Sequence, residues 1–169
     1  NVQHDTAQKK FGTSSILFDG TGDYLTFPDS DDWDFSKNTT NNFTIECWVR
    51  FNTKGADEQL IAHRSGGAWS QINFGLSLNG SATAFEAIFS NGSSGVVLRS
   101  STNPSTGTWY HVAFVRAGDR FDLYVDGTSE ANTTSALTPY NLSSTLYIGI
   151  LAGGIVPFDG WMDEIRISR

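Results

Sequence analysis

Apolar and polar residues alternate with a period of two along several stretches of the chain. In residues 43–51 every second residue is apolar, and the residues between are Thr, Glu, Trp and Arg. Residues 121–126, 146–150 and 161–168 alternate in a similar way, whereas residues 109–116 are almost continuously apolar, as in a central strand with both faces mostly covered. These patterns predict β-strands, and no segment shows convincing helical periodicity.

Turn signals separate these stretches at short intervals. They are Asp19-Gly20, Ser65-Gly66-Gly67, Asn79-Gly80, Asn91-Gly92, Thr106-Gly107, Asp126-Gly127 and Gly153-Gly154. Short strands joined by such turns, with no helix between them, predict an all-β fold, a two-sheet antiparallel sandwich or jelly roll. Residues 1–10 are polar and aperiodic, so we expect a loose lead-in there and a single domain over residues 11–169.

Composition and charge narrow the class of partner. The 169 residues are the size of one domain and carry a net charge of −7. This charge argues against nucleic acid and against anionic membrane surfaces, because both need clustered Lys and Arg. The longest apolar stretch, residues 146–158, is too short to span a bilayer, so no membrane insertion is expected. The single cysteine, Cys47, excludes an intrachain disulfide and is expected to be a buried thiol.

Several short motifs follow one another along residues 11–168. They are Phe18-Asp19-Gly20 with Asp23-Tyr24-Leu25, Phe43-Thr44-Ile45-Glu46-Cys47-Trp48-Val49, Trp109-Tyr110-His111-Val112-Ala113, Leu123-Tyr124-Val125-Asp126-Gly127 and Gly160-Trp161-Met162-Asp163-Glu164-Ile165-Arg166-Ile167. Their order resembles that of the laminin-G-like modules of the concanavalin A-like lectin/glucanase superfamily. The resemblance implies a concanavalin A-like jelly roll of two antiparallel sheets, with the first and last strands close together.

The same resemblance implies a setting for the protein. Members of the family sit in polysaccharide-degrading enzymes, adhesins, large cell-surface proteins and virion proteins. It therefore implies an extracellular, cell-surface or virion-surface location and other domains of a longer parent protein. A shared fold identifies a function less well than it identifies an architecture.

The acids of the predicted strands do not form a catalytic pair. A retaining glycosidase needs two carboxyl groups about 5 Å apart, and the superfamily's glucanases carry them on a Glu-x-Asp-x-x-Glu strand. Glu46 and Glu164 have no second acid two positions away on the same face. His111 lies inside a strand motif and is expected to be a hydrogen-bonded structural residue. We therefore expect a protein that is not an enzyme, and a hydrolase on the same fold is the least favoured alternative.

A calcium ion is implied where the first hairpin meets the last strand. The loop from Asp19 to Asp23 carries two glycines, and the family often binds calcium in this region, which would add Asp163 to Asp19 and Asp23. The alternative is that these acids belong to ordinary turns and a solvated strand end. The second acidic run, with four aspartates in residues 29–34, is expected to be a solvated loop.

A tryptophan in a loop is the best candidate for stacking on a sugar ring. Trp69 follows two glycines, with Arg64 and Asn73 near it in sequence, so Trp69, Arg64 and Asn73 form the candidate ligand site. The alternative is that Trp69 covers the core, and Trp33 is expected to anchor its loop. The other three tryptophans lie in strand motifs and are expected to be structural: Trp48, Trp109 and Trp161.

Two function hypotheses remain. The first is a secreted, non-catalytic recognition module that binds a polysaccharide or a glycoprotein glycan, as in adhesion. The second is a structural or protein-interaction spacer domain without a sugar site. Binding to carbohydrate discriminates between them.

Overall fold

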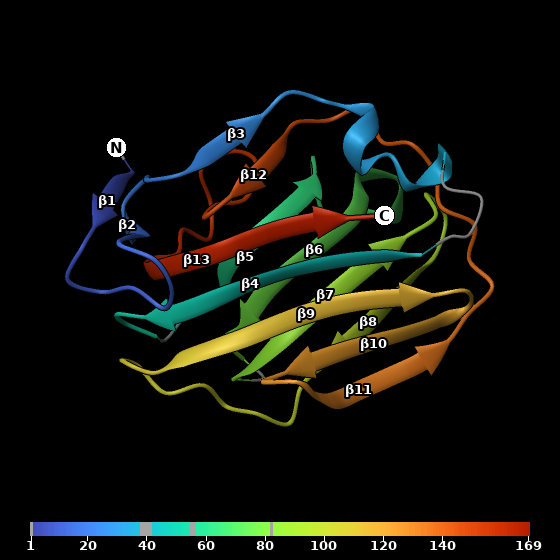
Figure 1. Ribbon diagram of the computed structural model, residues 1–169. Coiled ribbons are helices and arrows are strands. Elements are labelled where there is room, and N and C mark those ends of the chain that lie inside the picture. Colours follow the sequence, from blue (N-terminus) through green and yellow to red (C-terminus); the bar gives the residue numbers. More distant parts are fainter. Residues whose placement is uncertain (1, 38–41, 55–56, 82) are drawn as a thin grey trace.

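The computed structural model describes residues 2–37, 42–54, 57–81 and 83–169, and in them two antiparallel sheets pack face to face (Figure 1). The seven-stranded sheet has the order β1 (Gln3–Asp5), β2 (Ser15–Asp19), β13 (Asp159–Ser168), β4 (Phe43–Phe51), β9 (Trp109–Ala117), β10 (Arg120–Val125) and β11 (Thr128–Thr134). The six-stranded sheet has the order β3 (Leu25–Phe27), β12 (Leu146–Ile148), β5 (Glu58–Arg64), β6 (Ile72–Asn79), β7 (Ala84–Ser90) and β8 (Gly95–Arg99). The predicted all-β sandwich is confirmed.

Helical structure within the described residues is limited to three single 3-10 turns. They are η1 (Asp31–Trp33), η2 (Phe35–Lys37) and η3 (Trp69–Gln71). None of the helices in the described ranges is long and apolar enough to cross a membrane. The expectation that the chain has no helix beyond short turns is met for these residues.

The period-two pattern of β4 matches its burial. Its five apolar side chains are at most 2% exposed, while the residues between them are half-buried. Cys47 is one of the five, and burial raises the pKa of its thiol to about 12, as expected for an inert cysteine. Asp126 and Gly127 form the tight turn between β10 and β11, with φ of 47° and 79°. These are the left-handed conformations that an Asp-Gly pair tolerates.

Phenylalanine rings fill the space between the sheets. The Phe43 ring stacks on Phe35 at 4.4 Å and meets the edge of Phe114 at 5.4 Å, and Phe89 from the other sheet lies 5.5 Å from it. All four side chains are at most 2% exposed. Because side chains alternate along a strand, this packing sends every second residue of the same strands to an outer face.

The polar lead-in belongs to the sandwich, which corrects the expectation of a loose segment. Strand β1 pairs with β2, and the Asp5 carboxylate accepts a 2.7 Å hydrogen bond from the Trp161 indole nitrogen. Strand β13 lies between β2 and β4, so early and late segments of the chain are side by side (Figure 1). The closeness of the first and last strands was implied by the family resemblance.

A bulge interrupts β13 where it pairs with β4. Asp163 lies opposite Trp48 and Arg166 opposite Glu46, so β13 carries one more residue than its partner over this interval. Glu164, inside the bulge, has a φ of 47°. A bulge redirects the side chains around it, and this one determines which acids face the outside of the sheet.

We expect Gly149→Ala to destabilise the fold strongly. Gly149 has a φ of +84°, and a Cβ there would overlap the ring of the fully buried Phe18. Backbone strain and overpacking together should lower the free energy of unfolding by about 2–4 kcal/mol. Thermal melts measure the effect, with Gly67→Ala as the matched control, because a Cβ at Gly67 meets no atom within 4 Å. Equal melting temperatures of the two variants would contradict this packing.

Candidate functional site

The outer face of the six-stranded sheet carries the exposed loop tryptophan. In β8, Val96 and Leu98 point into the core, so the alternate residues of the strand face outward. Each of these outward residues has a cross-strand neighbour on β7: Ser90 with Gly95, Ile88 with Val97 and Glu86 with Arg99. The result is a strip that changes from small and apolar residues to charged ones along β8.

Trp69 lies on this strip, at its apolar end. The Trp69 ring occupies the space above Gly95 that a Cβ would otherwise fill. The Ser90 hydroxyl donates a 2.7 Å hydrogen bond to the Trp69 carbonyl and so holds the turn against β7. Trp69 is 37% exposed, which makes it the most exposed of the five tryptophans, and Val97, the next outward residue of β8 after Gly95, is 39% exposed. Trp69 therefore covers part of the strand and still offers part of its ring to solvent.

Arg64 and Glu86 form the polar part of the same face. Both line a cavity of about 120 Å³, together with Gln59, Ser77 and Asn79. The Glu86 carboxylate accepts hydrogen bonds from Arg99 Nε at 2.8 Å and from Asn79 Nδ2 at 3.1 Å. Burial lowers the pKa of Arg64, and the negative charge of Glu86 opposes this shift. These side chains are held in place and can offer donors and acceptors to a ligand.

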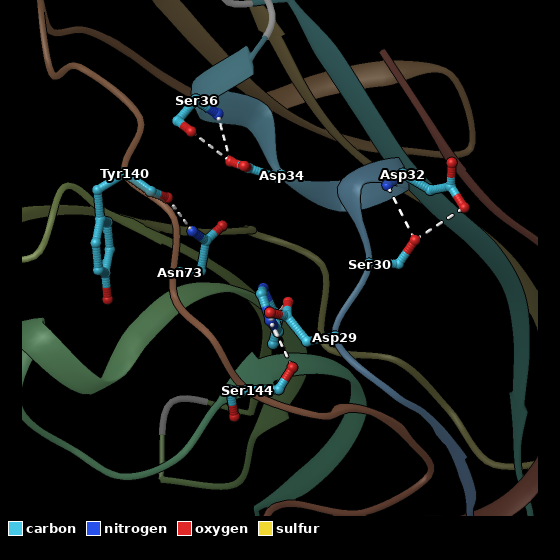
Figure 2. A network of polar contacts seen from close by, with 9 residues as sticks. Asp29, Ser30, Asp32, Asp34, Ser36, Asn73, Tyr140 and Ser144 are labelled. Carbon is cyan, nitrogen blue, oxygen red and sulfur yellow. Dashed lines mark hydrogen bonds and ion pairs between the residues drawn. The ribbon is translucent and has the colours of Figure 1, made fainter.

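Asn73 does not reach the surface, in contrast to the expectation. Its side chain is 1% exposed and Nδ2 donates a 2.6 Å hydrogen bond to the Tyr140 carbonyl (Figure 2). The Tyr140 hydroxyl in turn donates to the Ile72 carbonyl at 2.7 Å. Asn73 therefore fastens the loop before β12 to β6, and we leave it out of the ligand site.

The second acidic run is only partly a solvated loop. Asp34 is 2% exposed, and its Oδ1 accepts hydrogen bonds from the Ser36 backbone and hydroxyl at 3.0 and 2.5 Å (Figure 2). Asp31, by contrast, has a largely exposed side chain. The Trp33 ring packs against the edge of Phe27 at 6.3 Å, which fits the expected role as a loop anchor. Asp34 thus corrects the expectation that the whole run is solvated.

The structure separates the acids that were expected to share a calcium ion. In the β2–β13 register Asp19 lies opposite Asp159, whereas Asp163 is four residues further along, a separation of about 13 Å. The Asp163 carboxylate instead accepts the backbone N–H groups of Lys10 and Phe11, both at 2.9 Å. Asp23, the third acid of the expected set, is buried, with 4% of its surface exposed. Among the described residues, no group of three or more His, Cys, Asp or Glu side chains is placed to hold a metal ion.

Asp19 and Asp159 border an acidic hollow at this end of the sandwich. The hollow has a volume of about 710 Å³, and its charged lining residues are Asp19, Lys54, Asp57, Glu58 and Asp159. Burial raises the pKa of Glu58 to about 7, and the charge of Asp159 adds to this effect. The Asp159 backbone N–H, which donates to Glu58 Oε2 at 3.2 Å, acts in the opposite direction.

A further hollow lies on the outer face of the seven-stranded sheet and was missed in the sequence. Its volume is about 570 Å³, and it is lined by Phe11, Glu46, Trp48, His111, Glu164, Ile165 and Arg166. His111 Nε2 donates to Glu46 at 3.0 Å and Arg166 Nε donates to it at 2.6 Å, so His111 is hydrogen-bonded as expected. The β13 bulge brings Glu164 to the same hollow. Spacing within one strand cannot reveal that two acids from different strands line one hollow.

The chain belongs to a known superfamily. A laminin-G family model, described as the concanavalin A-like lectin/glucanases superfamily, matches residues 19–169. The chain is therefore a laminin-G-like domain of that superfamily. No curated protein sequence matches it.

Solved structures with the same fold come from proteins of several kinds. Domains LG4-5 of the mouse laminin alpha1 chain match with a TM-score of 0.69 and 18% identity, over 91% of this chain and 40% of that one. Domain 4 of an extracellular arabinanase from Geobacillus stearothermophilus, in complex with arabinotriose, matches with a TM-score of 0.69 and 18% identity. The match covers 99% of this chain and 74% of that one. The binding domain of botulinum neurotoxin DC, in complex with SialylT, matches with a TM-score of 0.69 and 14% identity. The match covers 99% of this chain and 41% of that one.

These matches extend beyond the length of the present chain. It spans about two fifths of the laminin and neurotoxin chains. At such low identity the likeness establishes the fold alone. It shows that this fold serves binding domains within larger proteins, although the superfamily also includes glucanases.

The raised pKa of Glu58 predicts a pH dependence of stability. The folded state holds the Glu58 proton more tightly than the unfolded chain does. The contribution of the protonated Glu58 side chain to the free energy of unfolding is therefore present at acidic pH and is lost as the pH rises toward 7. We expect the free energy of unfolding of the wild type to fall relative to that of Glu58→Gln between about pH 5 and pH 8. Urea titrations measure both, with Glu164→Gln as a control on the other sheet. Parallel curves for wild type and Glu58→Gln would contradict it.

Proposed function

We propose that this domain is a non-catalytic glycan-recognition module whose binding surface is the outer face of the six-stranded sheet. The observation that carries the proposal is the position of Trp69, the most exposed tryptophan, which covers Gly95 two residues before the exposed Val97 on the same face of β8. A sugar ring has an apolar face that packs on an aromatic ring. Trp69 and Val97 together supply such a surface outside the core.

The polar groups next to this surface suit sugar hydroxyls. Arg64 supplies N–H donors and Glu86 supplies carboxylate oxygens, and both line the same cavity. Glu86 is also held by Arg99, so its position is set before a ligand arrives. Hydrogen bonds to a sugar replace hydrogen bonds to water and contribute little net free energy. Affinity therefore depends mainly on the aromatic contact, and the polar groups provide orientation.

The comparisons support a binding role without identifying a ligand for this chain. The arabinanase domain was solved with arabinotriose and the neurotoxin binding domain with SialylT. Laminin and the extracellular arabinanase also support an extracellular location and a longer parent protein. A location on a cell or virion surface and a role in adhesion are part of the same proposal.

The absence of catalysis in this proposal rests on the state of Glu46. Its carboxylate accepts hydrogen bonds from both His111 and Arg166 in the hollow that also contains Glu164. Both of its oxygens are engaged by these donors, so neither is free to contact a glycosidic oxygen or a sugar carbon. The competing proposal, a spacer domain, predicts no retention on any carbohydrate.

Calcium at the first hairpin remains a second proposal, with a changed set of residues. Asp19 and Asp159 face each other across β2 and β13 and would supply two carboxylates, so backbone carbonyls and water would have to complete the coordination shell. Carboxylate oxygens are the ligands that calcium prefers. Asp159 thus takes the place expected for Asp163, whose carboxylate accepts the backbone N–H groups of Lys10 and Phe11. The Asp159 carboxylate itself accepts hydrogen bonds from Asn52 Nδ2 and the Thr53 hydroxyl, which fix its position beside Asp19.

Trp69→Ala tests the binding surface. We expect it to abolish retention in affinity electrophoresis on gels containing arabinan, xylan, β-glucan or galactomannan, whichever of these retains the wild type. Because part of the ring covers Gly95, the free energy of unfolding should fall by only about 1–2 kcal/mol. Denaturant titration of the same samples separates the two effects.

The matched control for this variant is Phe11→Ala. Phe11 is 48% exposed but lines the hollow on the seven-stranded sheet. Its truncation should leave retention unchanged. Retention that survives Trp69→Ala and disappears with Phe11→Ala would move the binding surface to the other sheet. No retention of the wild type on any gel would favour the spacer proposal.

Asp19→Asn tests the calcium proposal. We expect calcium to raise the melting temperature of the wild type and a chelator to reverse the rise. At a hundredfold excess of calcium over Kd, the free energy of unfolding should increase by about 2.7 kcal/mol. Asn can still accept the Thr21 N–H that Asp19 Oδ1 accepts at 2.9 Å, so the turn should survive in the variant. The variant should melt at one temperature with calcium or chelator. A wild type that is equally insensitive would remove the proposal.

A further inference from the structure

We infer that the ligand is an uncharged polysaccharide bound lengthwise along β8, with one sugar unit on Trp69 and Val97 and a later unit at the Arg64–Glu86 cavity. The inference rests on the proposed function and specifies its substrate class. It depends on the spacing, the chemistry and the charge of the two ends of the strip.

The spacing of the strip exceeds one sugar unit. Outward residues of a strand are about 6.6 Å apart, so Gly95, under Trp69, and Arg99 are separated by about 13 Å. Glu86 lies directly opposite Arg99. A single sugar ring that stacks on Trp69 cannot also reach Glu86. Contact with both ends requires a chain of at least two linked units.

The two ends of the strip would recognise different parts of a sugar. The Trp69 end is apolar, because Val97 is exposed and the Ser90 side chain opposite Gly95 is fully buried. The other end consists of charged groups. Arg99 donates a hydrogen bond to Glu86, and Arg64 lines the same cavity as Glu86. The first end suits ring stacking and the second suits hydroxyl groups in a fixed arrangement. These contacts define two subsites in one direction along the strand.

The charges on this face favour an uncharged ligand. Arg99 Nη2 lies 2.7 Å from Glu86 Oε2, so the two charges of this ion pair offset each other. The cavity that holds Arg64 is also lined by Asp57, Glu58 and Glu86. An acidic polysaccharide would need clustered basic groups without acidic partners, and it would be repelled by a net charge of −7. The lining of the cavity offers no such cluster among the described residues.

The experiment measures affinity against ligand length. Isothermal titration uses the monosaccharide to the hexasaccharide of whichever neutral polysaccharide retains the wild type, with alginate and polygalacturonate as acidic probes in gels. We expect the monosaccharide to bind weakly and the affinity to rise with length to a plateau, with no retention by the acidic polymers. Glu86→Gln should lower hexasaccharide affinity about tenfold and leave monosaccharide affinity unchanged. Trp69→Ala should lower both.

Two further variants keep the test decisive. Arg64→Met repeats the Glu86 test at the other side of the cavity, where Arg64 Nε also donates to the Gly66 carbonyl at 3.1 Å in the loop before Trp69. Arg166→Met, on the outer face of the other sheet, is the matched control and should bind every oligosaccharide as the wild type does.

The outcomes separate this inference from the proposed function. Equal affinity for monosaccharide and hexasaccharide would overturn the inference but leave glycan recognition standing. The same holds if acidic polymers are preferred, or if Arg64→Met and Glu86→Gln affect all lengths alike. Absence of binding to every carbohydrate would instead overturn the proposed function itself.

Discussion

The packing of phenylalanine side chains between the two sheets is the interaction on which the rest of the structure depends. Phe43 touches rings from its own sheet and from the opposite one, and these rings are almost completely buried. Burial of such large apolar side chains is the main favourable contribution to folding, and any loss of the alternation would expose them. The core thereby sets the direction of every second side chain, and the remaining side chains are left for the surface.

Exposed apolar residues therefore stand out on the outer faces. Trp69 covers Gly95, and Val97 is the next outward residue of the same strand, where polar side chains would serve solubility better. The neighbouring Arg99 and Glu86 are already paired, which reduces the ordering that a ligand would have to impose. This combination of an apolar contact and preorganised polar groups is typical of a recognition surface on a rigid sheet.

The acidic groups are used in several physical ways. Asp163 and Asp5 hold the beginning of the chain against β13 through hydrogen bonds. Glu46 forms an ion pair with Arg166 of the neighbouring strand. Asp19 and Asp159 face each other across two strands at the end of the sandwich. Only the last arrangement leaves acids gathered around a hollow with a single lysine, which is why it is the place to test for a cation.

Local patterns determined a large part of the architecture. Alternation identified β4 and β10, an Asp-Gly pair identified the turn after β10, and Cys47 was correctly expected to be buried. These features depend on neighbours in sequence, because strand periodicity and turn conformation are set within a few residues. The separation of Trp69 from the strand motifs also identified the most exposed tryptophan.

Contacts between distant segments decided the composition of the sites. The register of β13 against β2 places Asp159, not Asp163, beside Asp19, and the sequence between them has no signal for this choice. One extra residue in β13 brings Glu164 to the hollow of Glu46, and the loop before β12 buries Asn73. Register and loop cover are properties of segments that are far apart in the chain and meet only on folding. A shift of one residue changes which side chains share a face, so only the tertiary structure could assign them.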